Sequence, residues 1–197
     1  MPSIIEYPFV LERLRERGLK CLYHNSGAFG FAADVPTQSF GWIGPNDESI
    51  RPLAKALTRA VSAPFEKNLA DLAVRAWLEF LPGVVWVMPK SHWAYEMEFG
   101  SREWMPALIE SVGIDPGMLS GRNNGSAIEF ETSDACLFAE FTERLLQGLL
   151  GSDFMLVFPD HPIVCTIHSH KQLWWTTSDQ AIADRLQRLL PTVDDNK

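Results

Sequence analysis

Hydrophobic positions along the chain switch repeatedly between the spacing of strands and the spacing of helices. Alternation with a period of two residues predicts strands at 19–24, 28–33, 39–43, 84–88, 92–99, 126–131, 153–158, 162–169 and 171–176. Apolar spacings of three and four residues, bounded by Ser, Asn, Asp, Pro or Gly, predict helices at 8–17, 48–62, 68–80, 102–112, 134–149 and 179–190. Several strands follow one another directly, which predicts an α+β fold with a largely antiparallel sheet.

The same order of patterns occurs twice along the chain. A strand followed by a helix recurs at an offset of 88 positions, and the hairpin after it recurs at an offset of 70, which aligns Tyr95 with Cys165. We therefore expect two β-α-β-β pseudo-repeats that share one sheet with helices packed on one face. The first would span 1–120, with an N-terminal helix and an inserted helix, and the second 121–197, with a C-terminal helix. Together they would form one fused globular unit.

Composition narrows the classes of partner. The chain carries 17 Lys and Arg against 25 Asp and Glu, a net charge of −8. Phosphate backbones are bound by clustered Lys and Arg, so we expect no nucleic-acid partner. No signal-peptide pattern or membrane-length apolar run is present, and three widely spaced cysteines favour reduced thiols. These features predict a cytoplasmic protein with no membrane partner. They leave open a homodimer, and an acidic surface that caps a basic partner.

Carboxylates and imidazoles recur at positions two residues apart. Glu96 and Glu98 form one such pair, and His168 and His170 form another at the matching place in the second repeat. Residues two apart on a strand share a face, so the repeats could bring the four side chains together. Such a group suits a Zn, Mn or Fe site, with His168, His170 and Glu98 as ligands, or an acid/base pair. The simpler interpretation is a polar strand face covered by water.

Tryptophan is abundant, with seven residues in the chain. Trp174 and Trp175 are adjacent on a predicted strand, so their side chains must point to opposite faces of the sheet. One of them can enter the core, and the other must be covered by something on the opposite face. Trp86 lies between two valines on its own predicted strand, so one face of that strand must be covered in the same way. An aromatic side chain on the second face indicates a ligand groove or a partner interface, unless the sheet is simply buried on both sides.

Known catalytic and phosphate-binding motifs are missing from the sequence. It contains no G-x-x-x-x-G-K-[ST], G-x-G-x-x-G, G-x-S-x-G or H-E-x-x-H pattern, so we predict no cofactor. The glycines in 27–30 and 41–44 are expected to mark bulges or close backbone approach.

Our first hypothesis is a non-enzymatic module that binds a small molecule or a protein partner in a Trp-lined cleft or on a sheet face. Its candidate binding residues are Trp86, Trp174, Trp175, Glu96, Glu98, His168 and His170. The alternative is a metal-dependent or acid/base enzyme that uses His168, His170, Glu96 and Glu98.

Overall fold

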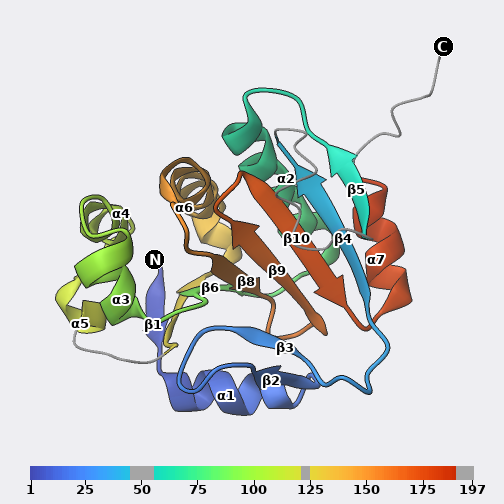
Figure 1. Ribbon diagram of the computed structural model, residues 1–197, viewed down its shortest axis with the longest axis horizontal. Coiled ribbons are helices and arrows are strands. Elements are labelled where there is room, and N and C mark those ends of the chain that lie inside the picture. Colours follow the sequence, from blue (N-terminus) through green and yellow to red (C-terminus); the bar gives the residue numbers. More distant parts are fainter. Residues whose placement is uncertain (45–55, 121–124, 190–197) are drawn as a thin grey trace.

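A computed structural model describes residues 1–44, 56–120 and 125–189 of the chain. Within these residues the main sheet has eight strands in the order β1-β7-β6-β8-β9-β10-β4-β5 (Figure 1). Its strands are β1 (Ser3–Ile5), β4 (Gln38–Ile43), β5 (Leu57–Ala60), β6 (Val85–Pro89), β7 (Ala127–Phe130), β8 (Phe154–Val157), β9 (Ile163–His168) and β10 (Gln172–Thr177). Neighbouring strands are antiparallel except for the parallel pair β4–β5. The short strands β2 (Leu19–Cys21) and β3 (Phe29–Phe31) form a separate hairpin.

Helices make up the rest of the regular structure. The longer ones are α1 (Tyr7–Arg15), α2 (Phe65–Phe80), α4 (Met105–Ser111), α6 (Ala135–Gly148) and α7 (Gln180–Gln187). Short helical pieces are α3 (Trp93–Tyr95), the π-helical turn η2 (Glu96–Gly100), α5 (Gly117–Ser120) and the 3-10 turn η3 (Thr132–Asp134). The predicted mixed α+β class and largely antiparallel sheet are confirmed. None of the described helices is long and apolar enough to cross a bilayer.

The main core lies on one face of the sheet, beneath α2, α6 and α7. One row of paired positions in this core crosses six strands through Phe40, Trp175, Cys165, Leu156, Val87 and Ile128. Aromatic residues on α2 and α6 belong to the same core and contact each other, as Trp77 and Phe138 do at 5.1 Å. Because the face is apolar along these six strands, the helices that cover it carry apolar stripes.

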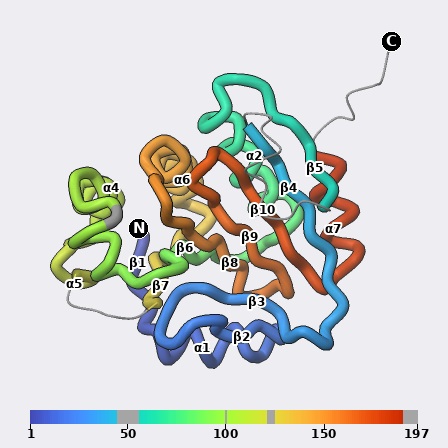
Figure 2. Tube along the Cα trace, in the orientation of Figure 1, coloured from blue at the N-terminus to red at the C-terminus, as the bar shows by residue number. Residues whose placement is uncertain are grey.

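The opposite face carries a second, smaller core. Helix α1 contributes Tyr7, Val10 and Leu14 to it, and the sheet contributes Trp86, Met88, Ala127, Met155, Val157 and Val164. The β2–β3 hairpin adds Leu19 and Phe29, and Figure 2 shows this hairpin lying beside β8 and β9, far from it in sequence. Our expectation that helices pack on one face was therefore incomplete, because α1 covers part of the second face.

The expected repeat is not shown by the structure. Strands of 1–120 and 121–197 interleave in one sheet, since β7 lies between β1 and β6. The predicted strand at 92–99, on which the alignment of Tyr95 with Cys165 rests, is wrong, because this segment forms α3 and η2. Trp93, Tyr95, Met97 and Phe99 fit a strand, but Trp93 and Met97 are also one helical turn apart. A short pattern of this kind does not distinguish the two structures.

The predicted helix at 48–62 is also wrong in its second half. Residues 57–60 form β5 and pair in parallel with β4. Residues 48–55 lie outside the described residues. Hydrogen bonding along a sheet edge here outweighs the helical spacing of the apolar residues.

Close backbone approach explains two glycines that the sequence flagged. A Cβ atom on Gly41 would lie 2.8 Å from Cζ3 of Trp174. A Cβ atom on Gly27 would overlap the carbonyl oxygen of Pro89 and lie 2.8 Å from Cγ of Met88. Gly27 therefore lets the loop of the β2–β3 hairpin rest directly on the end of β6.

Substitution of Gly27 should test this docking. We expect Gly27→Ala to lower the free energy of unfolding by about 1–3 kcal/mol, because rigid backbone must move to admit the methyl group. Gly30→Ala is the matched control, since its Cβ would meet only the end of the Leu22 side chain, at 3.1 Å. Urea denaturation of both variants measures the difference. Equal stabilities would show that the hairpin does not rest on β6 in this way.

Candidate functional site

A cavity of about 300 Å³ lies on the second face of the sheet, beside the part that α1 covers. We call it the inner chamber. Strands β8, β9 and β10 form its floor, and the β2–β3 hairpin and its loop form its cover. Its lining consists of Leu22, Phe29, Gly30, Lys90, Asp153, Met155, Val164, Thr166, His168, Trp174 and Thr176. Half of the ten side chains are apolar, and Lys90, Asp153 and His168 are the titratable ones.

Trp174 is held firmly in the inner chamber. It is only 3% exposed, and its Nε1 donates a hydrogen bond to Oε1 of Gln172 at 2.8 Å. Its ring lies over Gly41, the paired position on β4, where a side chain would collide with it. The indole face is therefore a fixed apolar surface.

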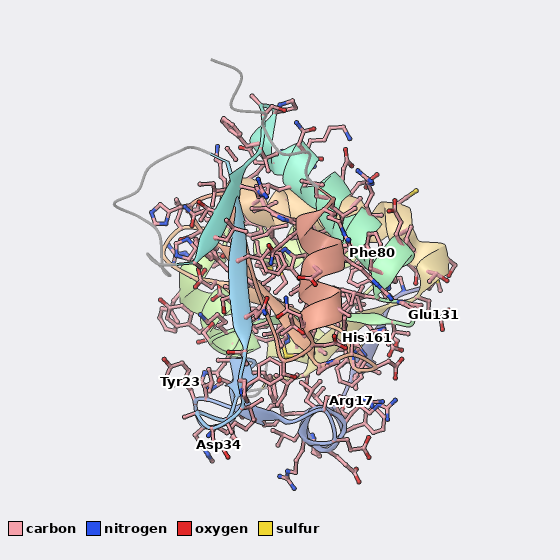
Figure 3. All side chains as sticks on the ribbon, turned by 90° about the vertical axis from the view of Figure 1, so that its right-hand side faces the viewer. Arg17, Tyr23, Asp34, Phe80, Glu131 and His161 are labelled. Atoms are coloured by element: carbon pink, nitrogen blue, oxygen red, sulfur yellow. The ribbon has the colours of Figure 1, made fainter. Side chains whose placement is uncertain are left out.

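A second, more open cavity of about 530 Å³ adjoins the inner chamber, and we call it the mouth. Lys90, Asp153 and His168 line both spaces, so the two are adjacent. The remaining lining residues of the mouth are Tyr23, Ser91, Tyr95, Gly151, Ser152, Ser169 and His170. Tyr23 lies on the hairpin side of the molecule, whereas Phe80 of α2 lies on the far side (Figure 3).

Asp153 organises the junction between the inner chamber and the mouth. Its Oδ2 accepts from Nζ of Lys90 at 3.3 Å, and its Oδ1 accepts from the backbone N–H of Ser169 at 3.3 Å. The backbone N–H of Lys90 donates to the Asp153 carbonyl oxygen at 2.9 Å, which extends the pairing of β6 with β8. The ion pair is thus fixed by strand register as well as by charge.

His168 and His170 meet at the edge of the mouth, although β9 ends at His168 and His170 lies in the turn that follows it. Their rings stack with centroids 4.9 Å apart, and the backbone N–H of His170 donates to Nδ1 of His168 at 3.3 Å. Neutral His168 therefore carries its proton on Nε2, which lies 4.0 Å from Oδ1 of Asp153. Burial lowers the pKa of His168, and the nearby His170 and Lys90 lower it further, while Asp153 raises it.

Glu96 lies behind the mouth rather than in it. Its carboxylate is fully buried and accepts hydrogen bonds from three serine hydroxyls. Ser91 Oγ donates to Oε1 at 2.8 Å, and Ser101 and Ser152 donate to Oε2 at 3.1 and 3.2 Å. Two of these serines, Ser91 and Ser152, also line the mouth.

Besides Glu96, three candidate residues line neither cavity. Trp86 lies in the second core, where its Nε1 donates to Oε2 of Glu129 at 2.8 Å and its ring contacts Phe9. Trp175 lies in the main core. Glu98 is exposed on η2. Of the seven candidates, the structure brings Trp174, His168 and His170 to the cavities and places Glu96 directly behind them.

Sequence reasoning missed Lys90, Asp153 and the serines. Lys90 and Asp153 are 63 positions apart, and only the register of β6 against β8 brings them together. Among the described residues, no group of three or more His, Cys, Asp or Glu side chains is arranged to hold a metal ion. Comparisons of the chain with known protein families, with curated proteins and with solved structures found no match.

The electrostatics of His168 can be tested by NMR titration. We expect its pKa to lie below the ordinary value of 6.5, because burial disfavours the imidazolium. Asp153→Asn should lower this pKa further, and Lys90→Met should raise it. A pKa above 6.5, or a rise in Asp153→Asn, would contradict the geometry.

The same shift makes stability depend on pH. Because the folded pKa of His168 is depressed, the unfolded chain takes up a proton more readily. The contribution to stability is therefore present above the unfolded pKa of 6.5 and is lost as pH falls through the folded pKa. His168→Gln should remove this part of the pH dependence, measured as the difference in urea midpoints between pH 7.5 and 5.5.

Proposed function

We propose that this protein is a non-enzymatic module that binds a small organic molecule in the inner chamber and the mouth. The apolar part of the ligand would lie against Trp174, and its polar part would lie near Lys90, Asp153 and His168. The observation that carries the proposal is that Lys90, Asp153 and His168 line both cavities. An apolar wall that includes the fixed Trp174 ring therefore lies next to a cluster of polar groups, as in small-molecule sites generally.

The size of the inner chamber supports this proposal. Small-molecule sites are clefts or cavities of about 300–1,000 Å³. The space of about 300 Å³ equals the liquid volume of about ten waters. Its apolar lining gives such waters few partners, so their displacement by an apolar group would favour binding.

The acid/base alternative has less support from the geometry. The Nδ1 lone pair of His168 already accepts a hydrogen bond from the His170 backbone, so it is not free to take a proton from a substrate. Glu98 lines neither cavity, and Glu96 is separated from the mouth by Ser91 and Ser152. A metal-dependent mechanism has no ligand group among the described residues.

The sequence also predicted a cytoplasmic location and left a homodimer open. We keep the cytoplasmic location as part of the proposal, with a small intracellular ligand. A homodimer is not required, because the described residues of one chain line both cavities.

Fragment screening of ¹⁵N-labelled protein tests the proposal. We expect small apolar molecules with one polar group to shift the indole N–H resonance of Trp174, assigned with a Trp174→Phe variant, and to leave that of Trp86 unchanged. Thr166→Trp should lower their affinity at least about tenfold, because the new ring fills the inner chamber.

Lys20→Trp is the matched control, since Lys20 is exposed on β2 and lines neither cavity. It should leave the affinity unchanged. Fragments that bind equally well to Thr166→Trp, or that shift only signals away from the inner chamber, would contradict the proposed site.

A further inference from the structure

Glu96 is a buried carboxylate with no cationic partner among the residues that the structure describes. It is 0% exposed, and its hydrogen bonds come from the neutral hydroxyls of Ser91, Ser101 and Ser152. Among the described residues, no Lys, Arg or His lies within ion-pair distance of it. Buried charges are normally paired, because removing an ion from water costs several kcal/mol, about as much as many proteins have in total stability.

The charges around the mouth do not balance this carboxylate. Lys90 and Asp153 neutralise each other across 3.3 Å. His168 is held in its neutral form, with Nε2 facing Asp153 and Nδ1 accepting from the backbone. One negative charge, that of Glu96, is left over behind the wall of the mouth.

Glu96 determines how two serine hydroxyls face the mouth. Ser91 and Ser152 each donate their single hydroxyl hydrogen to Glu96, so each can offer only oxygen lone pairs to a molecule in the mouth. Two aromatic rings, Tyr23 and Tyr95, also line the mouth, and aromatic faces attract cations. Acceptor oxygens, aromatic rings and an uncompensated carboxylate together favour a positively charged head group.

We propose that the ligand is an amphipathic amine. Its ammonium group would lie in the mouth against the Ser91 and Ser152 hydroxyl oxygens, and its apolar body would lie in the inner chamber against Trp174. This inference rests on the small-molecule function proposed above and adds the chemical class of the ligand.

An anionic head group fits the mouth less well. Lys90 lines the mouth, and its ammonium is already paired with Asp153. An anion would also lie beside the carboxylate of Asp153, with Glu96 behind the wall, on a protein whose net charge is −8. Long-range and local electrostatics therefore both favour a cation.

Matched probe pairs test the charge preference. 2-Phenylethylamine and 2-phenylethanol have nearly the same shape, and the amine is protonated at pH 7 as a lysine is. Pentylamine and pentan-1-ol form an aliphatic pair. Affinities are measured from the shift of the Trp174 indole N–H at pH 7. We expect each amine to bind about tenfold more tightly than its alcohol, the effect of one charge-assisted hydrogen bond.

Two variants test whether the preference for amines depends on the charges around the mouth. Glu96→Gln should reduce the amine-to-alcohol ratio to about one while leaving the affinity for the alcohol similar. Lys90→Met leaves the carboxylate of Asp153 without its partner, so it should increase the ratio. If Glu96→Gln does not fold, the direction of change in Lys90→Met decides whether the mouth favours a cation.

The experiment distinguishes failure of the proposed ligand class from failure of the proposed binding site. Alcohols that bind as tightly as amines, or an amine preference that survives Glu96→Gln or falls in Lys90→Met, would overturn the ligand class and leave the binding site standing. If no member of either pair shifts the Trp174 resonance, both the ligand class and the proposed site are wrong.

Discussion

Burial of β8, β9 and β10 on both faces is the constraint on which the rest of the structure depends. Adjacent residues on these strands belong to different layers, so Trp175 enters the main core and Trp174 enters the second face. A shift of register by one residue would exchange the two layers completely. The row Gly41, Trp174, Thr166, Met155 and Met88 crosses the second face just as the row through Trp175 crosses the first.

The inner chamber follows from unequal covers over the two faces. Three helices with apolar stripes close the first face along its length. In the described part of the chain, the second face is covered by α1, whose Phe9 contacts Trp86, and by a hairpin whose strands are three residues long. Beyond α1, the hairpin lies over the apolar sheet surface but leaves a cavity between itself and the strands. Where that surface reaches the strand ends, Lys90 and Asp153 supply the polar boundary.

The sequence predicted many individual helices and strands well, because these depend on short-range periodicity. The helices near 68–80, 134–149 and 179–190 and the strands β6 to β10 are all found close to their predicted positions. The two-residue period of a strand was enough to predict that Trp174 and Trp175 occupy opposite faces. Trp174 is the one that lines the inner chamber.

Long-range pairing was beyond such reasoning, as the segment after β6 shows. Trp93 and Glu96 are both buried, a spacing of three that belongs to a helix, whereas the alternation of aromatic and polar residues suggested a strand. Choosing between them requires knowing what lies beside the segment, and Ser152 arrives there from 56 positions away. The Lys90–Asp153 pair was invisible for the same reason.

The helical turn at Glu96 changes what this residue can do. On an outward strand face it would have been a solvated acid next to Glu98, available to a metal ion. In the π-helical turn it points inward, and turns of this kind are often found at functional sites. Its three serine partners come from before the turn, after it and the loop preceding β8. One carboxylate therefore holds together three serines from different segments, two of which line the mouth. An apolar replacement would leave the three hydroxyls without this acceptor. The three hydrogen bonds offset part of the cost of removing the carboxylate from water.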